Sequence, residues 1–413
     1  MNKYFTFSLL NVLLVSLAAR VVAFYFFADT NLVNEWYILV NNLNLKGVLG
    51  LYVVAGEHLA VPNIAEEYEV VLPSVFMPPL YAYFIYLIKY FFANITNYIN
   101  VIIFFQILLS TFTVYIFFKI INLTENYKTS WLCSLIFSLI PINIYAAVQI
   151  SSISIQIFLL VCFFYILRIY SIKKILSLKN LYFFSLLSGL LILLRGEFIL
   201  FYFMTIIYFF YFYEKKIRLF FISIIIMSLI ISPYLIRNYN NFETLVITKS
   251  FGFNLLKGNN PEFKVEGNLS FIQNNYNRES LTIETNNLYE INLDDFYKET
   301  AIKFIKQNPE EYLKNYFLKI FSFTFIDLTS SNEKYYNLTH IVPKIILSIF
   351  SLLGGIIMLR KKNFFQYLSI YYFSNIFFFS IFFILPRYSL IMLPIQILLS
   401  LEFVKFLQRK FFY

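Results

Sequence analysis

Long apolar runs alternate with short polar segments along most of the chain. Five of these runs have the length of about 20 residues that an α-helix needs to cross the hydrocarbon core of a bilayer. They are Tyr4–Ala28, Asn97–Ile121, Arg218–Ile236, Ile341–Leu359 and Phe364–Ile384. We interpret the first run as a membrane helix, because its apolar stretch is longer than that of a typical signal peptide. Together with shorter apolar runs, the pattern predicts an all-α polytopic membrane protein with about ten to twelve transmembrane helices.

The composition agrees with this pattern and argues against several other classes. Of the 413 residues, 60% are hydrophobic and only 14% are charged, whereas soluble domains carry about 25% charged residues. The net charge of +10 does not indicate nucleic-acid binding, because the basic residues gather in short loops, as they do on cytoplasmic membrane faces. Cys133 and Cys162 lie in apolar runs, and His58 and His340 have no metal-ligand spacing. We expect neither a disulfide framework nor a metal site.

The basic loops orient the predicted helices. By the positive-inside rule we place four of them in the cytoplasm. They are Arg168–Lys179, Lys215–Arg218, Arg360–Lys362 and the tail from Lys405. The turn at Arg195–Glu197 and a hairpin near Pro386–Arg387 then lie outside. Five apparent spans precede Arg168, where an even number is required, so either the count differs or one stretch, such as the short run around Pro141, does not cross alone.

The acidic residues mark two insertions on the outer side. Of the 23 Asp and Glu residues, six lie between Ala28 and Val75 and thirteen between Arg237 and His340. Both segments fall outside the cytoplasm in this topology. We therefore expect a single membrane domain, residues 1–413, with a first extracytoplasmic loop at 28–75 and a second extracytoplasmic insertion at 237–340.

Both insertions contain patterns typical of surface helices. Between Asn31 and Leu45, apolar residues recur at helical spacing, which predicts an amphipathic helix that lies flat on the membrane. They are Leu32, Trp36, Leu39, Val40 and Leu43. In the second insertion, Asp294–Asp295 is expected to cap one helix, and Asn308–Glu311 has the cap, proline and first-turn acids of another. An aromatic stripe from Tyr312 to Phe321 predicts that this helix also lies at the interface.

Two acids just after the first predicted span are candidates for a general base. Asp29 and Glu35 would lie next to the membrane surface. Partial loss of water there raises the pKa of a carboxyl toward the range in which it removes a proton at neutral pH. The alternative is that both are solvated loop acids, one of which caps the surface helix.

Three arginines at outer span ends are candidates for holding a phosphate. Arg195 interrupts the otherwise apolar stretch Leu181–Tyr213, and a charge at membrane depth is costly unless it is paired. Arg237 and Arg387 end other spans. The guanidinium fork matches phosphate oxygens bidentately, so the three side chains together suit a lipid phosphate. The alternatives are a tight hairpin in which Glu197 neutralises Arg195, and interfacial anchoring.

The chain also carries several short strings in a particular order after the acid-bearing first loop. They are Met77–Tyr81 (MPPLY), Leu194–Glu197 (LRGE), Ser232–Tyr239 (SPYLIRNY), Gly252–Pro261 (GFNLLKGNNP), Asn308–Pro309 and Pro386–Tyr388 (PRY). Their order and spacing resemble those of the bacterial members of glycosyltransferase family 39, the membrane relatives of protein mannosyltransferases and lipid A aminoarabinose transferases. The resemblance covers nearly the whole chain. In the LRGE string, Gly196 stands where the family usually has proline.

The resemblance implies the GT-C fold and an enzyme that transfers a sugar, with inversion, from a polyprenyl-phosphate carrier to an acceptor outside the cytoplasm. The family's first-loop acid is the general base, which assigns that role to Glu35, with Asp29 as the alternative. Arginines such as Arg195, Arg237 and Arg387 would stabilise the departing phosphate. Further candidates for substrate binding are Tyr81, Glu197, Asn259, Asn260 and Tyr388.

No cofactor follows from this mechanism, and it needs no metal. Many relatives place an acid in the second outer loop, where this chain reads Gln149–Ser154. A divalent metal therefore stays open as an alternative.

We predict a hexosyl- or pentosyltransferase of the bacterial inner membrane. Its partners would be a lipid-linked sugar donor, membrane lipids and a cell-envelope acceptor that is a glycan, a lipid such as lipopolysaccharide, or a protein. Two alternatives stay open: a transporter or flippase of lipid-linked sugars, and a non-catalytic subunit of a polysaccharide assembly system. The first fits less well, because transporters commonly have internal repeats and Gly/Pro-broken helices, whereas this chain has 10 Gly and no visible repeat.

Overall fold

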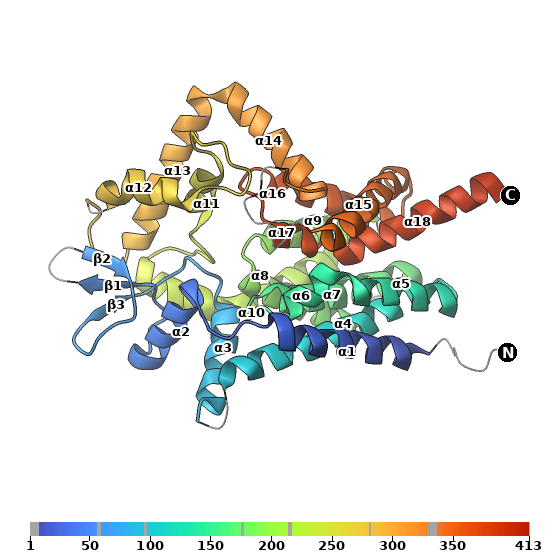
Figure 1. The fold of residues 1–413 in the computed structure, drawn as a ribbon, viewed down its shortest axis with the longest axis horizontal. Coiled ribbons are helices and arrows are strands. Elements are labelled where there is room, and N and C mark those ends of the chain that lie inside the picture. The colour runs from blue at the N-terminus through green and yellow to red at the C-terminus, as the bar shows by residue number, and fades with distance from the viewer. Residues whose placement is uncertain are drawn as a thin grey trace.

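The computed structural model has two regions that differ in their elements (Figure 1). It describes residues 8–55, 59–94, 97–174, 177–213, 217–280, 282–328, 330 and 337–412. Long helices form a bundle, and short helices with a small sheet gather at one end of it. The beginning of the first helix and the end of the last lie at the opposite end of the bundle. His58, Lys215 and residues 4–7 of the first predicted span lie outside the described residues.

Helices long and apolar enough to cross a membrane dominate the bundle. Five such helices occur in the described residues: α1 (Leu9–Phe27), α4 (Tyr98–Asn122), α7 (Ile153–Lys173), α10 (Ile217–Phe242) and α15 (Leu338–Met358). The prediction of an all-α polytopic membrane protein is therefore confirmed. The count of ten to twelve spans stays a prediction, because it requires other helices of the bundle to cross the membrane as well. The other helices are α3 (Pro79–Phe92), α8 (Leu178–Leu194), α9 (Phe198–Ile206) with its π-helical extension η1 (Ile207–Tyr213), α16 (Phe364–Phe379) and α18 (Leu393–Phe412).

The run around Pro141 is a broken helix, as the topology allowed. Helix α5 (Tyr127–Leu139) and helix α6 (Pro141–Ala147) meet at an angle of 61°. Proline at the first position of α6 has no N–H to donate, and its ring forces the preceding residue out of helical geometry. Ile140 is accordingly extended, with φ −63° and ψ 119°. The short α6 therefore does not cross on its own.

In the described part of the first loop, one helix is followed by a sheet that the hydrophobic pattern does not predict. Helix α2 (Asn34–Lys46) ends at Gly47, whose φ of +68° favours glycine. Strands β1 (Tyr52–Ala55), β2 (Leu59–Pro62) and β3 (Val70–Leu72) follow. They form an antiparallel sheet in the order β2-β1-β3, in which Tyr52 pairs with Pro62 and with Leu72.

Helix α2 is amphipathic as predicted, but its apolar face packs on the protein rather than on the membrane. Leu39 and Leu43 are buried in a cluster with Ala82 of α3 and Tyr234 of α10. Trp36 meets Tyr81 edge to face, with 5.0 Å between ring centroids. The apolar stripe therefore docks the first loop onto the bundle.

Among its described residues, the second insertion contains four helices, and one predicted cap is wrong. They are α11 (Phe251–Gly258), α12 (Leu269–Ser280), α13 (Tyr289–Gln307) and α14 (Pro309–Thr324). Asp294 lies inside α13 and does not cap it. Its Oδ1 accepts a hydrogen bond at 2.9 Å from the backbone N–H of Phe253, in the first turn of α11. Asp294 therefore caps a helix that lies across from its own.

Helix α14 begins at Pro309 as predicted, although the side chain of Asn308 donates back to the Phe304 carbonyl instead of capping. Its aromatic stripe faces outward: Phe317 is 64% exposed and Phe321 43%. The opposite face carries Lys319, which is fully buried. Contact of the stripe with the membrane interface stays a prediction.

The approach of α15 to α18 offers a test of the packing. A Cβ atom at Gly354 would lie 2.0 Å from the backbone oxygen of Leu399, whereas one at Gly355 would lie 3.1 Å from the ring of Phe373. Backbone cannot move aside as a ring can, and overpacking costs about 1–3 kcal/mol. We expect Gly354→Ala to lower the thermal unfolding midpoint in detergent clearly more than Gly355→Ala. Equal losses would show that this close approach does not limit the packing.

Candidate functional site

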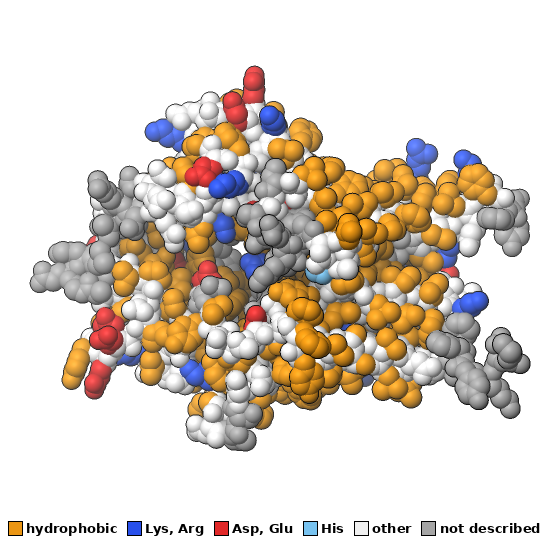
Figure 2. Space-filling view, viewed as in Figure 1, with side chains coloured by type: hydrophobic (Ala, Val, Ile, Leu, Met, Phe, Trp, Pro, Cys, Tyr) orange, Lys and Arg blue, Asp and Glu red, His pale blue; other side chains and the backbone are white. Residues whose placement is uncertain are grey.

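A cavity of about 580 Å³ lies where the bundle meets the two insertions. Figure 2 shows a hollow near the middle of the molecule, in which acidic and basic side chains are visible among apolar ones. The cavity walls come from segments that are far apart in the chain. They are the end of α1, the start of α2, the approach to α3, the α6–α7 loop, the α8–α9 turn, α11 with the loop before it, and the segment from α16 to α17 (Pro386–Leu390).

Both candidate bases line this cavity. Asp29 directly follows α1 and is half-buried, and Glu35 lies in the first turn of α2. The Oδ2 atom of Asp29 accepts a hydrogen bond at 2.7 Å from the backbone N–H of Ile150. Burial raises the pKa of Asp29, and this hydrogen bond partly opposes the rise. The first loop is thus tied to the α6–α7 loop at the acid itself.

Arg195 lines the cavity with an unused hydrogen-bond donor. It ends α8 in an extended conformation, so the predicted turn between two apolar helices is present. Its Nε atom is buried without a hydrogen-bond partner. Arg195 and Glu197, both described, form no ion pair with each other. The neutralised hairpin is therefore not what the structure contains, and the guanidinium of Arg195 keeps one N–H without an acceptor.

Two further cations line the cavity. Arg387, at the start of α17, is exposed and lies beside Tyr388. Lys257, on α11, lies over the ring of Phe383 at 4.3 Å from the centroid. Burial lowers the pKa of Lys257, and the neighbouring charge of Arg387 lowers it further. Lys257 lies within the string GFNLLKGNNP, but no local pattern distinguishes it from the other lysines of the chain.

Aromatic rings form several parts of the remaining lining. Phe76 meets Phe253 edge to face at 5.3 Å, and Phe251 meets Phe382 in the same way at 5.3 Å. Polar groups such as Ser250 and Asn254 lie between these rings. A cavity that combines aromatic walls with carboxylates and cations suits a ligand that is itself part apolar and part anionic.

Two predicted site residues lie outside the cavity lining and have structural partners. Arg237 donates hydrogen bonds from its guanidinium to the carbonyls of Ser74 (2.9 Å) and Leu49 (3.0 Å). Tyr81 is fully buried, and its hydroxyl donates to Gln106 Oε1 at 2.8 Å. Their positions support the walls but do not reach the cavity.

Asn259 and Asn260 are also buried behind the cavity. The side-chain amide of Asn259 donates to the Leu255 carbonyl at 2.8 Å and to the Ile381 carbonyl at 2.9 Å. That of Asn260 donates to the Lys257 carbonyl at 2.9 Å. The two asparagines fix the end of α11 and join it to the segment that carries Arg387.

Within the described ranges, no group of three or more His, Cys, Asp or Glu side chains is placed to hold a metal ion. The expectation that the reaction needs no metal stays a prediction.

Lys319 of α14 is hydrogen-bonded to the end of α11, and its burial makes the stability of the protein depend on pH. Its Nζ atom donates to the Gly258 carbonyl and to Asn259 Oδ1, each at 2.8 Å. Burial lowers the pKa of Lys319 to about 7. Between this value and the ordinary lysine pKa of about 10.4, the unfolded chain binds a proton that the folded chain releases. The stability contributed by Lys319 therefore rises as the pH increases from about 7 to about 10.

We expect the unfolding midpoint of the wild type, measured in detergent relative to that of Lys319→Met, to rise between pH 7 and pH 10. The full effect is on the order of a few kcal/mol. Lys314→Met, on the exposed side of α14, is the matched control and should show no such trend. A pH-independent difference for Lys319→Met would contradict the assignment.

Comparison with solved structures shows which fold these elements form. The chain is similar to the archaeal oligosaccharyltransferase AglB from Archaeoglobus fulgidus, described in complex with an inhibitory peptide and a dolichol-phosphate, with a TM-score of 0.55 and 10% identity. A second structure of that enzyme, tethered to an acceptor peptide containing the NVT sequon, matches with a TM-score of 0.55 and 12% identity. A third, in complex with Zn and sulfate, matches with 0.54 and 12%.

The alignments cover 97% of this chain in all three cases but only about half of the oligosaccharyltransferase chain, 50%, 50% and 49% respectively. No protein-family model matches the chain, and no curated protein matches it either. The predicted resemblance to glycosyltransferase family 39 therefore stays a prediction. What the comparison establishes is the fold: almost the whole chain folds as a GT-C type membrane protein, the architecture of the oligosaccharyltransferases.

Proposed function

We propose that this protein is a membrane glycosyltransferase that moves a sugar from a polyprenyl-phosphate carrier to an acceptor on the extracytoplasmic side. The observation that carries the proposal is the pairing, in one cavity, of a carboxylate with a raised pKa and an arginine with a buried, unpartnered N–H. The fold supports it, since the similar solved structures are of an enzyme described with a dolichol-phosphate and with an acceptor peptide.

The donor phosphate would lie among the cavity cations. Arg195 offers its free Nε–H, Arg387 is accessible at the start of α17, and Lys257 adds a third positive charge. A guanidinium binds two phosphate oxygens at once. As the bond between the anomeric carbon and the phosphate oxygen breaks, negative charge grows on the phosphate, and fixed cations stabilise that charge more than they stabilise the starting ester.

Asp29 is the better candidate for the base. Its carboxylate would take the proton of the acceptor hydroxyl while the hydroxyl oxygen attacks the anomeric carbon from the side opposite the phosphate, which gives inversion. The Ile150 N–H fixes its orientation and burial raises its pKa, and both features suit a base. The family resemblance assigns the base to Glu35, which lines the same cavity and is better suited to contact the sugar or the acceptor.

Four further parts of the proposal rest on the sequence resemblance alone. They are the transfer of a hexose or a pentose, a cell-envelope acceptor, membership of glycosyltransferase family 39, and a location in the bacterial inner membrane. A transporter of lipid-linked sugars would not need Asp29 to ionise. Transfer of label from donor to acceptor is therefore the deciding measurement.

The base assignment is tested with purified protein in liposomes, radiolabelled polyprenyl-phosphate sugars and a cell-envelope acceptor extract. Asp29→Asn should lower transfer by about 10²–10⁴-fold, the usual contribution of a general base, while Glu35→Gln should lower it less. Because the pKa of Asp29 is raised, wild-type transfer should increase with pH as Asp29 loses its proton. Full activity of Asp29→Asn would remove Asp29 from this role.

The phosphate site is tested in the same assay. Arg195→Gln should lower kcat by about 10²–10³-fold, as expected when one donor to the developing charge is lost. Arg237→Gln is the contrasting variant: its effect should appear in the unfolding midpoint, because Arg237 binds backbone carbonyls outside the cavity. Equal kinetic losses in both variants, with folding intact, would contradict the distinction.

A further inference from the structure

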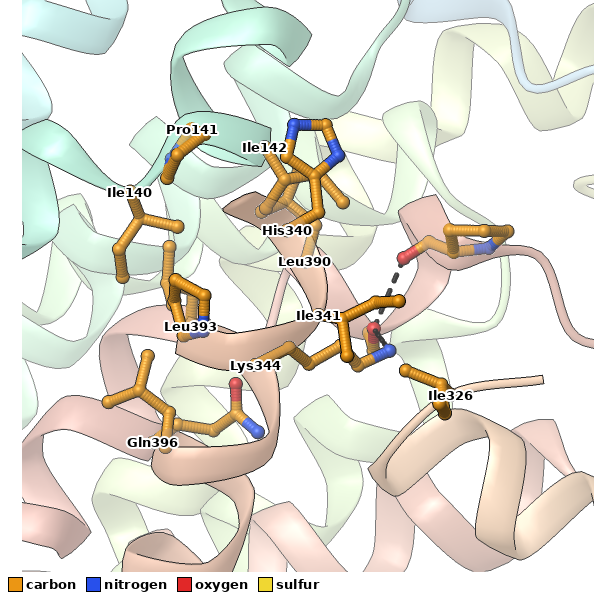
Figure 3. Close-up of a pocket in the computed structure, with 14 residues that line it drawn as sticks. Ile140, Pro141, Ile142, Ile326, His340, Ile341, Lys344, Leu390, Leu393 and Gln396 are labelled. Atoms are coloured by element: carbon orange, nitrogen blue, oxygen red, sulfur yellow. Dashed lines mark hydrogen bonds between the residues drawn. The ribbon is translucent and has the colours of Figure 1, made fainter. Parts of the chain in front are cut away.

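A second, much smaller cavity lies between α6, α15, α17 and α18 (Figure 3). Its volume is about 40 Å³, and most of its lining is aliphatic. The aliphatic wall includes Ile142, Ile341, Leu390 and Leu393. The function proposed above does not use this cavity.

One cation lies in this apolar surrounding. The Nζ atom of Lys344 donates a hydrogen bond to Ser389 Oγ at 2.9 Å, and that hydroxyl donates to the Pro386 carbonyl at 3.1 Å (Figure 3). An ammonium group has three N–H donors, and this bond uses one of them. None of the ion pairs found among the described residues includes Lys344. A cation in a membrane helix without a carboxylate partner costs at least a few kcal/mol, which marks it as a candidate site.

The depth of Lys344 indicates what kind of anion would reach it. Helix α15 begins at Leu338, so Lys344 lies roughly 9 Å along the helix at a rise of about 1.5 Å per residue. Because α15 is a candidate membrane span, this position is near the boundary between lipid headgroups and chains. Because most of the lining is aliphatic, an anion that is joined to an apolar chain suits this position better than a free anion.

The two cavities share a wall. Helix α17 places Arg387 and Tyr388 in the large cavity, and it places Pro386 and Ser389 in the small one. A phosphate bound by Arg387 is therefore separated from Lys344 by a single helix of five residues.

We propose that the Lys344 cavity binds the phosphate of a lipid, and that this lipid is the carrier after it has lost its sugar. The assignment of the lipid rests on the proposed function. The cavity is too small for a sugar phosphate, whereas the cavity at Asp29 is more than ten times larger. Cleavage of the donor also turns a phosphodiester into a phosphomonoester, which carries more negative charge and interacts more strongly with an unpaired ammonium. The shared chemistry is a lipid phosphate, and an anionic phospholipid is the other source of it.

The proposal is tested by binding to the purified full-length protein in detergent, which requires no turnover. The probes are a polyprenyl monophosphate and, separately, phosphatidylglycerol. Wild type should bind the monophosphate at least tenfold more tightly than Lys344→Met does, and Lys344→Arg should keep most of the affinity. Lys361→Met, an exposed lysine beyond the other end of α15, is the control and should bind as the wild type does.

A second variant covers the case in which Lys344→Met does not fold. Ile341→Trp fills the cavity without removing the cation, and it should also abolish binding of the monophosphate. Equal binding by wild type, Lys344→Met and Ile341→Trp would overturn the site. Equal competition by phosphatidylglycerol would keep the lipid-phosphate site but overturn the carrier as its ligand. If Lys344-dependent binding is present and no donor gives sugar transfer, the proposed function fails while the site stands.

Discussion

The cavity at Asp29 depends on how firmly one short segment, Ser74–Val75, is held. Arg237 of α10 donates to the Ser74 carbonyl. Glu290 of α13 accepts hydrogen bonds from Ser74 Oγ at 2.7 Å and from the Val75 N–H at 2.6 Å. Glu290 is buried, which raises its pKa to about 7 despite these hydrogen bonds and the nearby charge of Arg237. Helix α10 and the second insertion therefore both hold the first loop at Ser74, and the cavity walls keep their relative positions as a result.

Many of the helices and some of the cavity residues could be predicted, because they depend on patterns within short stretches of the sequence. Helices that face lipid need long apolar runs. Four of the five candidate membrane helices, α1, α4, α10 and α15, therefore begin and end within a few residues of a predicted run, apart from the C-terminal end of α10, which extends beyond its run. Charged residues in such runs are costly, so Arg195 could be singled out from its surroundings alone. Asp29, Glu35, Arg387 and Tyr388, which line the cavity, could be named as candidates because loops between apolar runs are where a chain of this kind can place polar chemistry.

The remaining features depend on partners that lie far away in the chain. No pattern around Arg237 says that its guanidinium binds loop carbonyls, or that Asp294 caps α11 rather than its own helix. Lys319 looks like any lysine of a surface helix, and only the tertiary structure shows that it is buried against Gly258 and Asn259. The three short strands were missed because they are only three to four residues long, and a stretch of that length has little periodicity to detect.

The unpartnered N–H of Arg195 has a consequence for how affinity and stability are related in this fold. A buried donor without an acceptor makes the folded protein less stable by about 1–3 kcal/mol than it would be with the donor satisfied. A ligand that supplied the acceptor would recover that free energy on binding. Stability and affinity therefore oppose each other here, because a substitution that supplied an acceptor from the protein itself would remove this contribution to binding. Evolution toward a more robust protein would therefore be expected to work on the lipid-facing surfaces and to leave this arginine unsatisfied.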